Sequence, residues 1–303
     1  MDYFSSKGLL KAVVSTKIQH FENPEIENIA IVKGIPFYRI ARKELNTTVQ
    51  DLFYKIHPDV VVMCGFTYRI PKSLFSIPHL GFFNIHFSLL PAYRGADPVF
   101  WQIKNGEQTG GISIHRVDEN FDSGEVVLQQ SIPFIPGETW GICNSRYNAP
   151  LFNMLSKLIE SLNKGEQLKP LEIDGNNSSY YKNPDAADLI IQWDLFTAKQ
   201  IENLVNASNP SAGGAITYLH QQLVRILEVS PVDGKGEPHM APGTIIHTDA
   251  TGLYVQCLGS NILRINILKL SEGFITGFKL VALGLKKGDC FESVVAQHGV
   301  LSN

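Results

Sequence analysis

Three short apolar segments constrain what this chain can fold into. They are Leu9–Ser15, Asp59–Cys64 and Gly81–His86, and apolar residues dominate each of them. Such runs are typical of strands in a parallel sheet that is covered on both faces. Pro24–Gly34 and Thr47–His57, which lie between them, carry the end signals or the apolar spacing of helices. This alternation predicts an α/β domain of βαβ units with a mostly parallel, Rossmann-like sheet.

The segments that follow continue the α/β pattern. Pro98–Asn105 has the composition of a short helix, and Gly111–Val117 and Glu125–Pro133 have that of strands. Thr139–Lys164 is predicted to be one long helix. Because proline removes a backbone donor and clashes with the preceding turn, Pro150 should kink or interrupt that helix.

The last third of the chain has a different texture. From Gly214 onward, short β segments are separated by Gly, Pro and Asp; they are Leu223–Ser230, Gly243–His247, Gly252–Cys257 and Asn261–Leu270. This pattern is typical of a small barrel or sandwich. A chain of 303 residues is long enough for two cores. We therefore expect one domain at residues 1–190 and a β-rich domain at 195–303. Pro170–Asp188, which is rich in Asn, Ser, Asp and Pro, is predicted to be a traversing linker.

The start of the chain departs from the usual order of a doubly wound sheet. Met1–Gly8 has the composition of the end of a helix, and Leu9–Ser15 is then the first strand. A doubly wound sheet normally starts with a strand before such a helix. We expect that this first strand is missing from the sequence and that upstream codons encode a short apolar strand with a glycine-bearing turn; otherwise the sheet is built differently. An in-frame stop codon immediately before Met1 would contradict the upstream strand.

Composition narrows the class of protein. The net charge is −3, so no global positive field attracts nucleic acid. The four cysteines form no C-x-x-C pair, which predicts neither a zinc site nor a disulfide framework, and Cys64 is expected to be a core residue. The sequence has no signal-peptide pattern and no run of about 18 apolar residues, the length that spans a membrane. A cytoplasmic enzyme or binding protein is therefore expected.

Candidate chemistry is concentrated in Gly81–Pro98. Residues two apart on a strand point to the same side, so Asn84 and His86 are expected to project together near the strand's C-terminal end. Open α/β sheets hold their ligands at that end. A carboxylate that could join them is Asp122, in a Phe-Asp-Ser-Gly segment. An isolated Asn-x-His more often marks a buried strand with a satisfied histidine, but the flanking Ser-Leu-Leu-Pro-x-x-Arg-Gly favours a functional site.

Three stretches resemble the formyltransferases that use 10-formyltetrahydrofolate. The most specific is Asn84–Gly95 (Asn-Ile-His-Phe-Ser-Leu-Leu-Pro-Ala-Tyr-Arg-Gly), and Cys64–Pro71 and Thr109–Gly124 resemble the segments before and after it. In the tail, Asn206–Gly214 and Pro242–Ile245 resemble the C-terminal domain of the tRNA and amino-arabinose enzymes. The resemblance covers nearly the whole chain and implies a Rossmann-like catalytic domain followed by an OB-like domain.

This resemblance implies roles for particular residues. Asn84 would donate a hydrogen bond to the oxyanion formed during formyl transfer, and His86 would donate or shuttle a proton. Asp122 would set the protonation state of His86 and help to take the proton of the amine. The reaction needs no metal and no covalent nucleophile. A turn of the Asx type is the structural alternative for Asp122.

The resemblance also implies where the two substrates bind. Backbone groups would hold the folate pterin along two segments, which contain Thr67, Tyr68, Ile70, Asp118 and Phe121. Tyr68 and Phe121 could equally be packing residues. Arg94 would either order the loop after the catalytic strand or meet an anionic group of the substrate, and Gly95 permits a tight turn there.

The sequence leaves three hypotheses for the function: formylation of a small amine, formylation of methionyl-tRNA, and folate binding without catalysis. Methionyl-tRNA formyltransferases carry a basic, glycine-rich loop that engages the acceptor stem. Here residues 16–27 contain three glutamates and one lysine, whereas an RNA stem favours Lys and Arg. This disfavours tRNA and favours a small-molecule amine, such as an amino sugar that is nucleotide-linked. A catalytically silent folate-binding protein is the alternative from another class.

Overall fold

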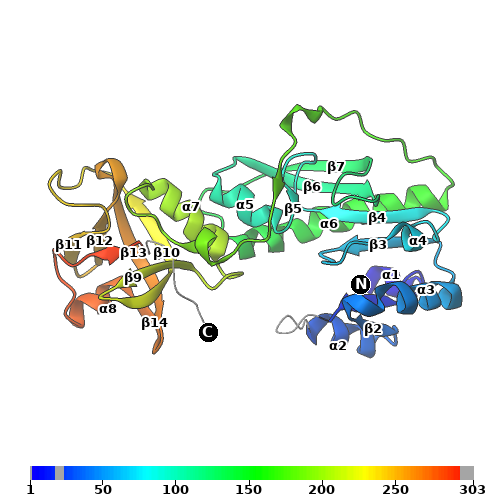
Figure 1. Ribbon diagram of the computed structural model, residues 1–303, viewed down its shortest axis with the longest axis horizontal. Helices are drawn as coiled ribbons and strands as arrows, with labels where there is room; N and C mark the ends of the chain where they lie inside the picture. Colours follow the sequence, from blue (N-terminus) through cyan, green and yellow to red (C-terminus); the bar gives the residue numbers. More distant parts are fainter. Residues whose placement is uncertain (1, 18–23, 294–303) are drawn as a thin grey trace, which may run out of the picture. The chain divides into compact units, whose positions relative to one another are not determined.

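The chain divides into two compact units (Figure 1). The structure, a computed structural model, describes residues 2–17 and 24–293. The first unit comprises residues 1–94, 111–130 and 153–179, and the second comprises residues 95–110, 131–152 and 180–303. The candidate site lies within the first unit. The predicted boundary between domains at residues 190–195 stays a prediction.

Helices and strands alternate through the first two thirds of the chain. The helical elements are α1 (Asp2–Ser6), α2 (Pro24–Val32), η1 (Arg42–Glu44), α3 (Leu45–Ile56), α4 (Lys72–Phe75), α5 (Pro98–Lys104), α6 (Trp140–Asn163), η2 (Gly175–Asn177) and η3 (Ala186–Leu189). The strands are β1 (Val13–Thr16), β2 (Phe37–Ile40), β3 (Val60–Cys64), β4 (Gly81–His86), β5 (Arg94–Gly95), β6 (Thr109–Arg116), β7 (Val126–Pro133) and β8 (Tyr180–Tyr181). The predicted elements are therefore present, with ends that differ by a few residues.

Parallel pairing predominates at the start of the chain. β1 pairs with β2 in parallel, and β3 pairs with β4 in parallel. The second sheet has the order β3-β4-β6-β7, and β6 runs antiparallel to β4. Among the described residues, no strand joins the β1-β2 pair to β3. The expectation of an upstream strand concerns codons outside the chain and stays a prediction.

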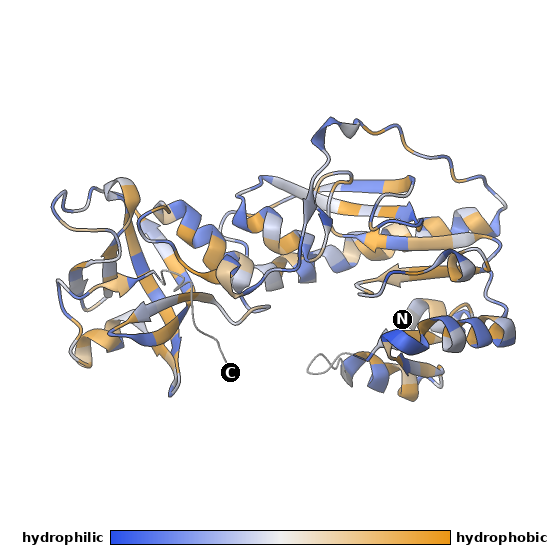
Figure 2. Ribbon diagram, viewed as in Figure 1, coloured by the Kyte–Doolittle hydropathy of each residue, from blue (hydrophilic) through white to orange (hydrophobic). Residues whose placement is uncertain are grey.

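β4 is an inner strand of this sheet and is largely buried. Five of its six residues are buried, and Phe82 belongs to a cluster with residues of α3 and α4, such as Phe53 and Leu74. β3 is apolar along its whole length, as its orange colour shows (Figure 2). Because β4 is covered on both faces, a polar side chain at its C-terminal end is held in a buried position.

Two local expectations differ from the structure. Cys64 is exposed at the end of β3 rather than packed in the core. The helix α6 runs through Pro150 as one element, so the predicted interruption is absent, while a kink there stays a prediction. The linker predicted at residues 170–188 is mostly irregular and includes the short elements η2, β8 and η3.

The tail forms an antiparallel sheet in the second unit. Its strands follow the order β11-β12-β13-β10-β9-β15, and β14 pairs with β13. The elements are α7 (Ala198–Ser208), β9 (Ala215–Leu219), β10 (Gln222–Val232), β11 (Ile245–Asp249), β12 (Gly252–Gln256), η4 (Leu258–Ser260), β13 (Ile262–Leu270), β14 (Gly273–Thr276), α8 (Gly277–Ala282) and β15 (Phe291–Glu292). The sheet curls into a half-barrel, which agrees with the predicted barrel-like domain.

Candidate active site

The end of β4 carries the two polar residues that the sequence singles out. Asn84 and His86 are 8% and 5% exposed, and both belong to the last three residues of the strand. Asp122 lies in the loop between β6 and β7, with a backbone φ of 52°. Aspartate tolerates this left-handed conformation better than most residues. The structure thus brings the three predicted catalytic residues together.

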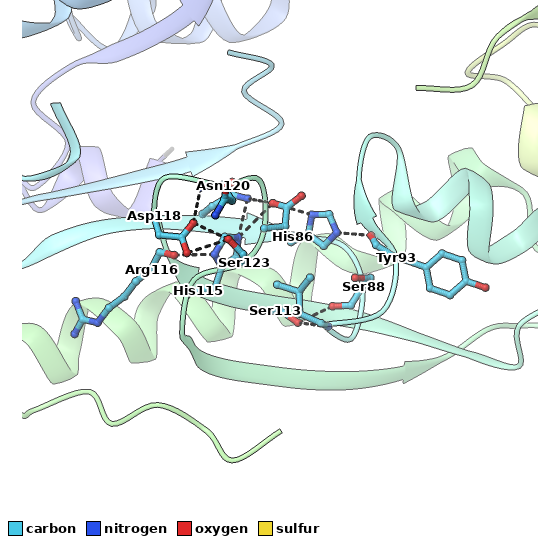
Figure 3. A network of polar contacts seen from close by, with 12 residues as sticks. His86, Ser88, Tyr93, Ser113, His115, Arg116, Asp118, Asn120 and Ser123 are labelled. Carbon is cyan, nitrogen blue, oxygen red and sulfur yellow. Dashed lines mark hydrogen bonds and ion pairs between the residues drawn. The ribbon is translucent and has the colours of Figure 1, made fainter. Parts of the chain in front are cut away.

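His86 is held between a backbone carbonyl and a carboxylate (Figure 3). Its Nε2 lies 2.7 Å from the Tyr93 carbonyl oxygen, and its Nδ1 lies 3.5 Å from Oδ1 of Asp122. Because a carbonyl oxygen only accepts, Nε2 carries a proton and donates it. The distance from Nδ1 to Asp122 is longer than a normal hydrogen bond. With the proton on Nε2, Nδ1 has a free lone pair, and Oδ1 of Asp122 is also an acceptor. A proton that enters the space between them can therefore bind to either His86 or Asp122.

Burial lowers the pKa of His86 from its ordinary value of 6.5. The negative charge of Asp122 and the bond to the Tyr93 carbonyl act in the opposite direction, and His115 lowers the pKa further. Burial has the largest effect because the charged ring loses its hydration. At neutral pH the ring is therefore held in its neutral form, which can accept a proton.

Asn84 is fixed by two acceptors. Its Nδ2 donates to Oδ1 of Asp122 at 3.1 Å and lies 3.1 Å from Nε2 of His115. Because an ionised carboxylate only accepts, the amide atom that faces it must be the nitrogen. Both amide hydrogens are thus engaged, and the amide plane is held on the side of Asp122.

A buried network shapes the loop that carries the Tyr93 carbonyl. The Ser113 hydroxyl accepts from the Leu90 N–H and the Gln129 amide, and it donates to the Ser88 carbonyl. The Ser88 hydroxyl donates to the Ala92 carbonyl at 2.7 Å. Ser88 and Ser113 are fully buried. These bonds fix the loop after β4, so the contact between Tyr93 and His86 depends on them (Figure 3).

The residues predicted to line the folate site occupy two neighbouring segments. Thr67 is exposed, whereas the Ile70 side chain is buried in the core and Tyr68 packs against the same cluster. Asp118 accepts hydrogen bonds from the Asn120 N–H and the Ser123 hydroxyl, so its carboxylate organises the loop. The ring of Phe121 is 45% exposed. An ion pair between Lys72 and Glu119 joins the two segments.

Arg94 and Gly95 lie in β5, which pairs with β8. The Nε atom of Arg94 is buried and has no hydrogen-bond partner among the described residues. Gly95 has a φ of 99°, and a Cβ there would lie 2.1 Å from the Tyr181 carbonyl oxygen. Only glycine fits this close approach of β5 to β8.

His115 is a residue of this cluster that sequence reasoning missed. It is 2% exposed, and its Nε2 lies 3.4 Å from Oδ1 of Asp122. The signal that could have found it is a histidine inside the apolar strand that precedes Asp122. Within residues 2–17 and 24–293, no group of three His, Cys, Asp or Glu residues has the arrangement of a metal site. No described helix is both long and apolar enough to cross a membrane.

Known proteins similar to this chain identify its family. The formyl transferase model matches residues 8–159, and the model of the formyl transferase C-terminal domain matches residues 185–279. The methionyl-tRNA formyltransferase of Citrifermentans bemidjiense is 31% identical over 86% of this chain and 82% of that protein. That of Aromatoleum aromaticum is 32% identical over 78% and 73%. The chain therefore belongs to the formyl transferase family, and it is an enzyme of that family, as the sequence motifs predicted.

Solved structures share the fold. The sugar 3N-formyl transferase WlaRD, solved in the presence of dTDP and 5-N-formyl-THF, has a TM-score of 0.62 at 17% identity and covers 86% of this chain and 92% of its own. HypX from Aquifex aeolicus, in complex with tetrahydrofolic acid, has a TM-score of 0.63 at 14% identity, over 93% of this chain and 50% of its own. These likenesses confirm the fold class predicted from the sequence.

Proposed function

We propose that this enzyme transfers a formyl group from 10-formyltetrahydrofolate to the primary amine of a small molecule of the amino-sugar type. The observation that carries the proposal is the buried cluster at the end of β4. There an amide, an imidazole and a carboxylate meet within 3.1–3.5 Å. Formyl transfer needs a hydrogen-bond donor for the carbonyl oxygen and a group that accepts the proton of the amine. The cluster offers both.

Each residue of the cluster has a distinct task in this proposal. As the new bond forms between the formyl carbon and the amine nitrogen, the Asn84 amide would donate to the formyl oxygen. The amine loses a proton to the shared position between His86 and Asp122. The bond from the formyl carbon to N10 of the folate then breaks, and N10 takes up a proton from the same pair. Neutral His86 suits this exchange, because burial lowers its pKa.

Two features of the structure support a folate site beside this cluster. In the part of the chain that the structure describes, no backbone hydrogen bond involves residues 66–70. Backbone N–H and C=O groups without a backbone partner would suit a ligand that pairs with backbone, as a pterin does. The exposed ring of Phe121 lies next to Asp122 in the chain and offers an apolar surface. These two features support a folate-binding role for the residues of the two segments, which are Thr67, Tyr68, Ile70, Asp118 and Phe121.

Charge supports a small acceptor. Residues 195–303 contain eight Lys or Arg and eight Asp or Glu residues, so the tail has no net positive charge. The acidic segment at residues 16–27 adds three glutamates; residues 18–23 of it lie outside the described residues. Proteins that bind RNA through phosphates concentrate Lys and Arg on the contact surface.

Methionyl-tRNA is the second candidate acceptor. The relatives from C. bemidjiense and A. aromaticum support it, because each bears the name methionyl-tRNA formyltransferase and is about 30% identical over most of the chain. Under this alternative, the surface that contacts the tRNA would carry fewer Lys and Arg residues than RNA-binding surfaces normally do.

One assay separates these proposals. The purified chain is incubated with 10-formyltetrahydrofolate and either a panel of nucleotide-linked amino sugars or charged initiator tRNA, and formylated product and tetrahydrofolate are measured. Product from an amino sugar supports the first candidate, and product from tRNA alone supports the second. If no acceptor gives turnover and Asn84→Ala behaves like the parent, the chain is a silent folate-binding protein and the proposed function is wrong.

A further inference from the structure

His115 stands directly opposite Asn84 in the sheet. The antiparallel register of β4 and β6 pairs these two residues, and the His115 side chain is buried. The two residues are brought together by the pairing of β4 with β6, although the loop after β4 and α5 lie between these strands in the sequence. A buried polar side chain must find partners within the protein, because an unpaired one is costly.

The contacts of His115 define its tautomer. Its Nδ1 lies 2.8 Å from the backbone carbonyl oxygen of Arg116. Since this oxygen only accepts, Nδ1 carries the proton, and the Nε2 of a neutral ring has a free lone pair. That lone pair lies 3.1 Å from Nδ2 of Asn84 and accepts one of its hydrogens. The Arg116 carbonyl thus sets the tautomer that makes His115 an acceptor toward Asn84.

We propose that His115 is a positioning residue for formyl transfer, which orients the Asn84 amide; this inference rests on the proposed function. Without a second acceptor, the amide of Asn84 would be held at one point only, by Asp122. With His115 in place, both hydrogens are fixed and the amide plane cannot turn. The hydrogen bond from Asn84 to neutral His115 is weaker than the bond to the charged carboxylate of Asp122. It is therefore the bond to His115 that breaks when this hydrogen is donated to the formyl oxygen. His115 therefore keeps that hydrogen in place before the substrate arrives.

Two variants test this role. His115→Leu removes the acceptor at similar volume, and we expect kcat to fall about 10- to 100-fold with little change in KM. His115→Gln can place a side-chain oxygen near the position of Nε2, and it should restore most of the lost kcat. If both variants keep the parent kcat while remaining folded, or if both lose it equally, the positioning role is wrong.

A double-mutant cycle shows whether His115 acts through Asn84. In an Asn84→Ala background, His115→Leu should cause no further loss of kcat, because the group that it positions is gone. Full additivity of the two losses would mean that His115 acts independently of Asn84 and would overturn the proposal.

The tautomer gives a readout that does not depend on activity. In a uniformly ¹⁵N-labelled sample, ring ¹⁵N shifts assigned by comparison with His115→Gln should show the tautomer in which Nδ1 carries the proton and Nε2 does not. The opposite tautomer would contradict the inference even if the enzyme is active. If the parent chain turns over no acceptor but shows this tautomer, the proposed function fails while the orientation of Asn84 by His115 stands.

Discussion

At the residue scale, Asp122 contributes the negative charge on which the cluster depends. Its Oδ1 accepts from Asn84 and faces a ring nitrogen of both His86 and His115, and its side chain is 9% exposed. Because this one carboxylate carries the negative charge that all three side chains face, its charge rather than its shape is the property to remove.

Asp122→Asn is therefore expected to reduce kcat strongly while the chain stays folded. The amide keeps the shape and an oxygen that can accept from Asn84, but it cannot take a proton, and loss of a proton-transfer group typically costs about 10²- to 10⁴-fold. Steady-state kinetics on the preferred amine would measure this, with Asp59→Asn as the matched control, since Asp59 is exposed and pairs with His79. A kcat within a few-fold of the parent would exclude Asp122 from proton transfer.

His86 links the site to the pH dependence of stability. Its pKa is lowered in the folded chain, so below about pH 6.5 the unfolded chain takes up a proton that the folded chain does not. Stability from this residue is complete above pH 6.5 and falls as the pH decreases toward the lower folded pKa, by up to about 1.4 kcal/mol per pH unit.

We accordingly expect the Tm of the parent to fall more between pH 7.5 and 5.5 than that of His86→Gln, which cannot take up this proton. Thermal unfolding at several pH values measures the difference. His79→Gln is the control, because it removes an exposed histidine that lies outside the cluster. Parallel profiles for the parent and His86→Gln would show that burial of His86 does not couple stability to protonation.

At the scale of elements, the loop between β6 and β7 depends on one glycine. A Cβ on Gly124 would lie 1.9 Å from the Arg116 carbonyl oxygen, the same oxygen that accepts from His115. No real side chain tolerates that distance, so a larger residue must move the loop that carries Asp122.

Gly124→Ala should therefore lower kcat at least about tenfold and destabilise the fold by about 1–3 kcal/mol. Kinetics and chemical denaturation measure the two effects. Gly175→Ala is the matched control: its Cβ would meet nothing within 4 Å, so its free energy of unfolding should change by less than about 0.5–1 kcal/mol. Parent-like kinetics for Gly124→Ala would mean that the position of this loop does not affect transfer.

The sequence predicted the part of the site that is local in the chain. Asn84 and His86 could be placed together because alternation on a strand is a fixed property of the backbone. His115 escaped prediction because its partner follows from the register between β4 and β6, which a single sequence does not specify. The contact between His86 and Tyr93 was also missed, since it uses a backbone carbonyl whose position depends on a buried network.

The same distinction holds for the elements. β3 and β4 were predicted from continuous apolar runs. β2 was not predicted, because it is a short strand that contains Arg39 and follows directly after Pro36. Cys64 was expected in the core because an apolar run ends there, yet the run leaves the packed region one residue earlier. Sequence texture thus identifies buried stretches better than it locates their ends.

At the scale of the whole molecule, charge distinguishes the two candidate acceptors. The chain carries 26 Lys and Arg against 29 Asp and Glu residues, and the tail is balanced. An RNA acceptor held by 6–10 phosphate contacts loses about 10³- to 10⁵-fold in affinity between 50 and 200 mM salt. A small amine that carries one or two phosphates releases few counterions and depends much less on salt.

We expect kcat/KM for the preferred amine to change less than about threefold between 50 and 200 mM KCl, because residues 195–303 carry no net positive charge and a small amine releases few counterions. The KM for the formyl-folate, measured in the same reactions, is the control, since it reports salt effects on the shared site. A fall of several hundredfold for the acceptor, with the folate KM unchanged, would indicate that phosphates along a nucleic acid are being neutralised. That result would make methionyl-tRNA the acceptor and reject the small amine.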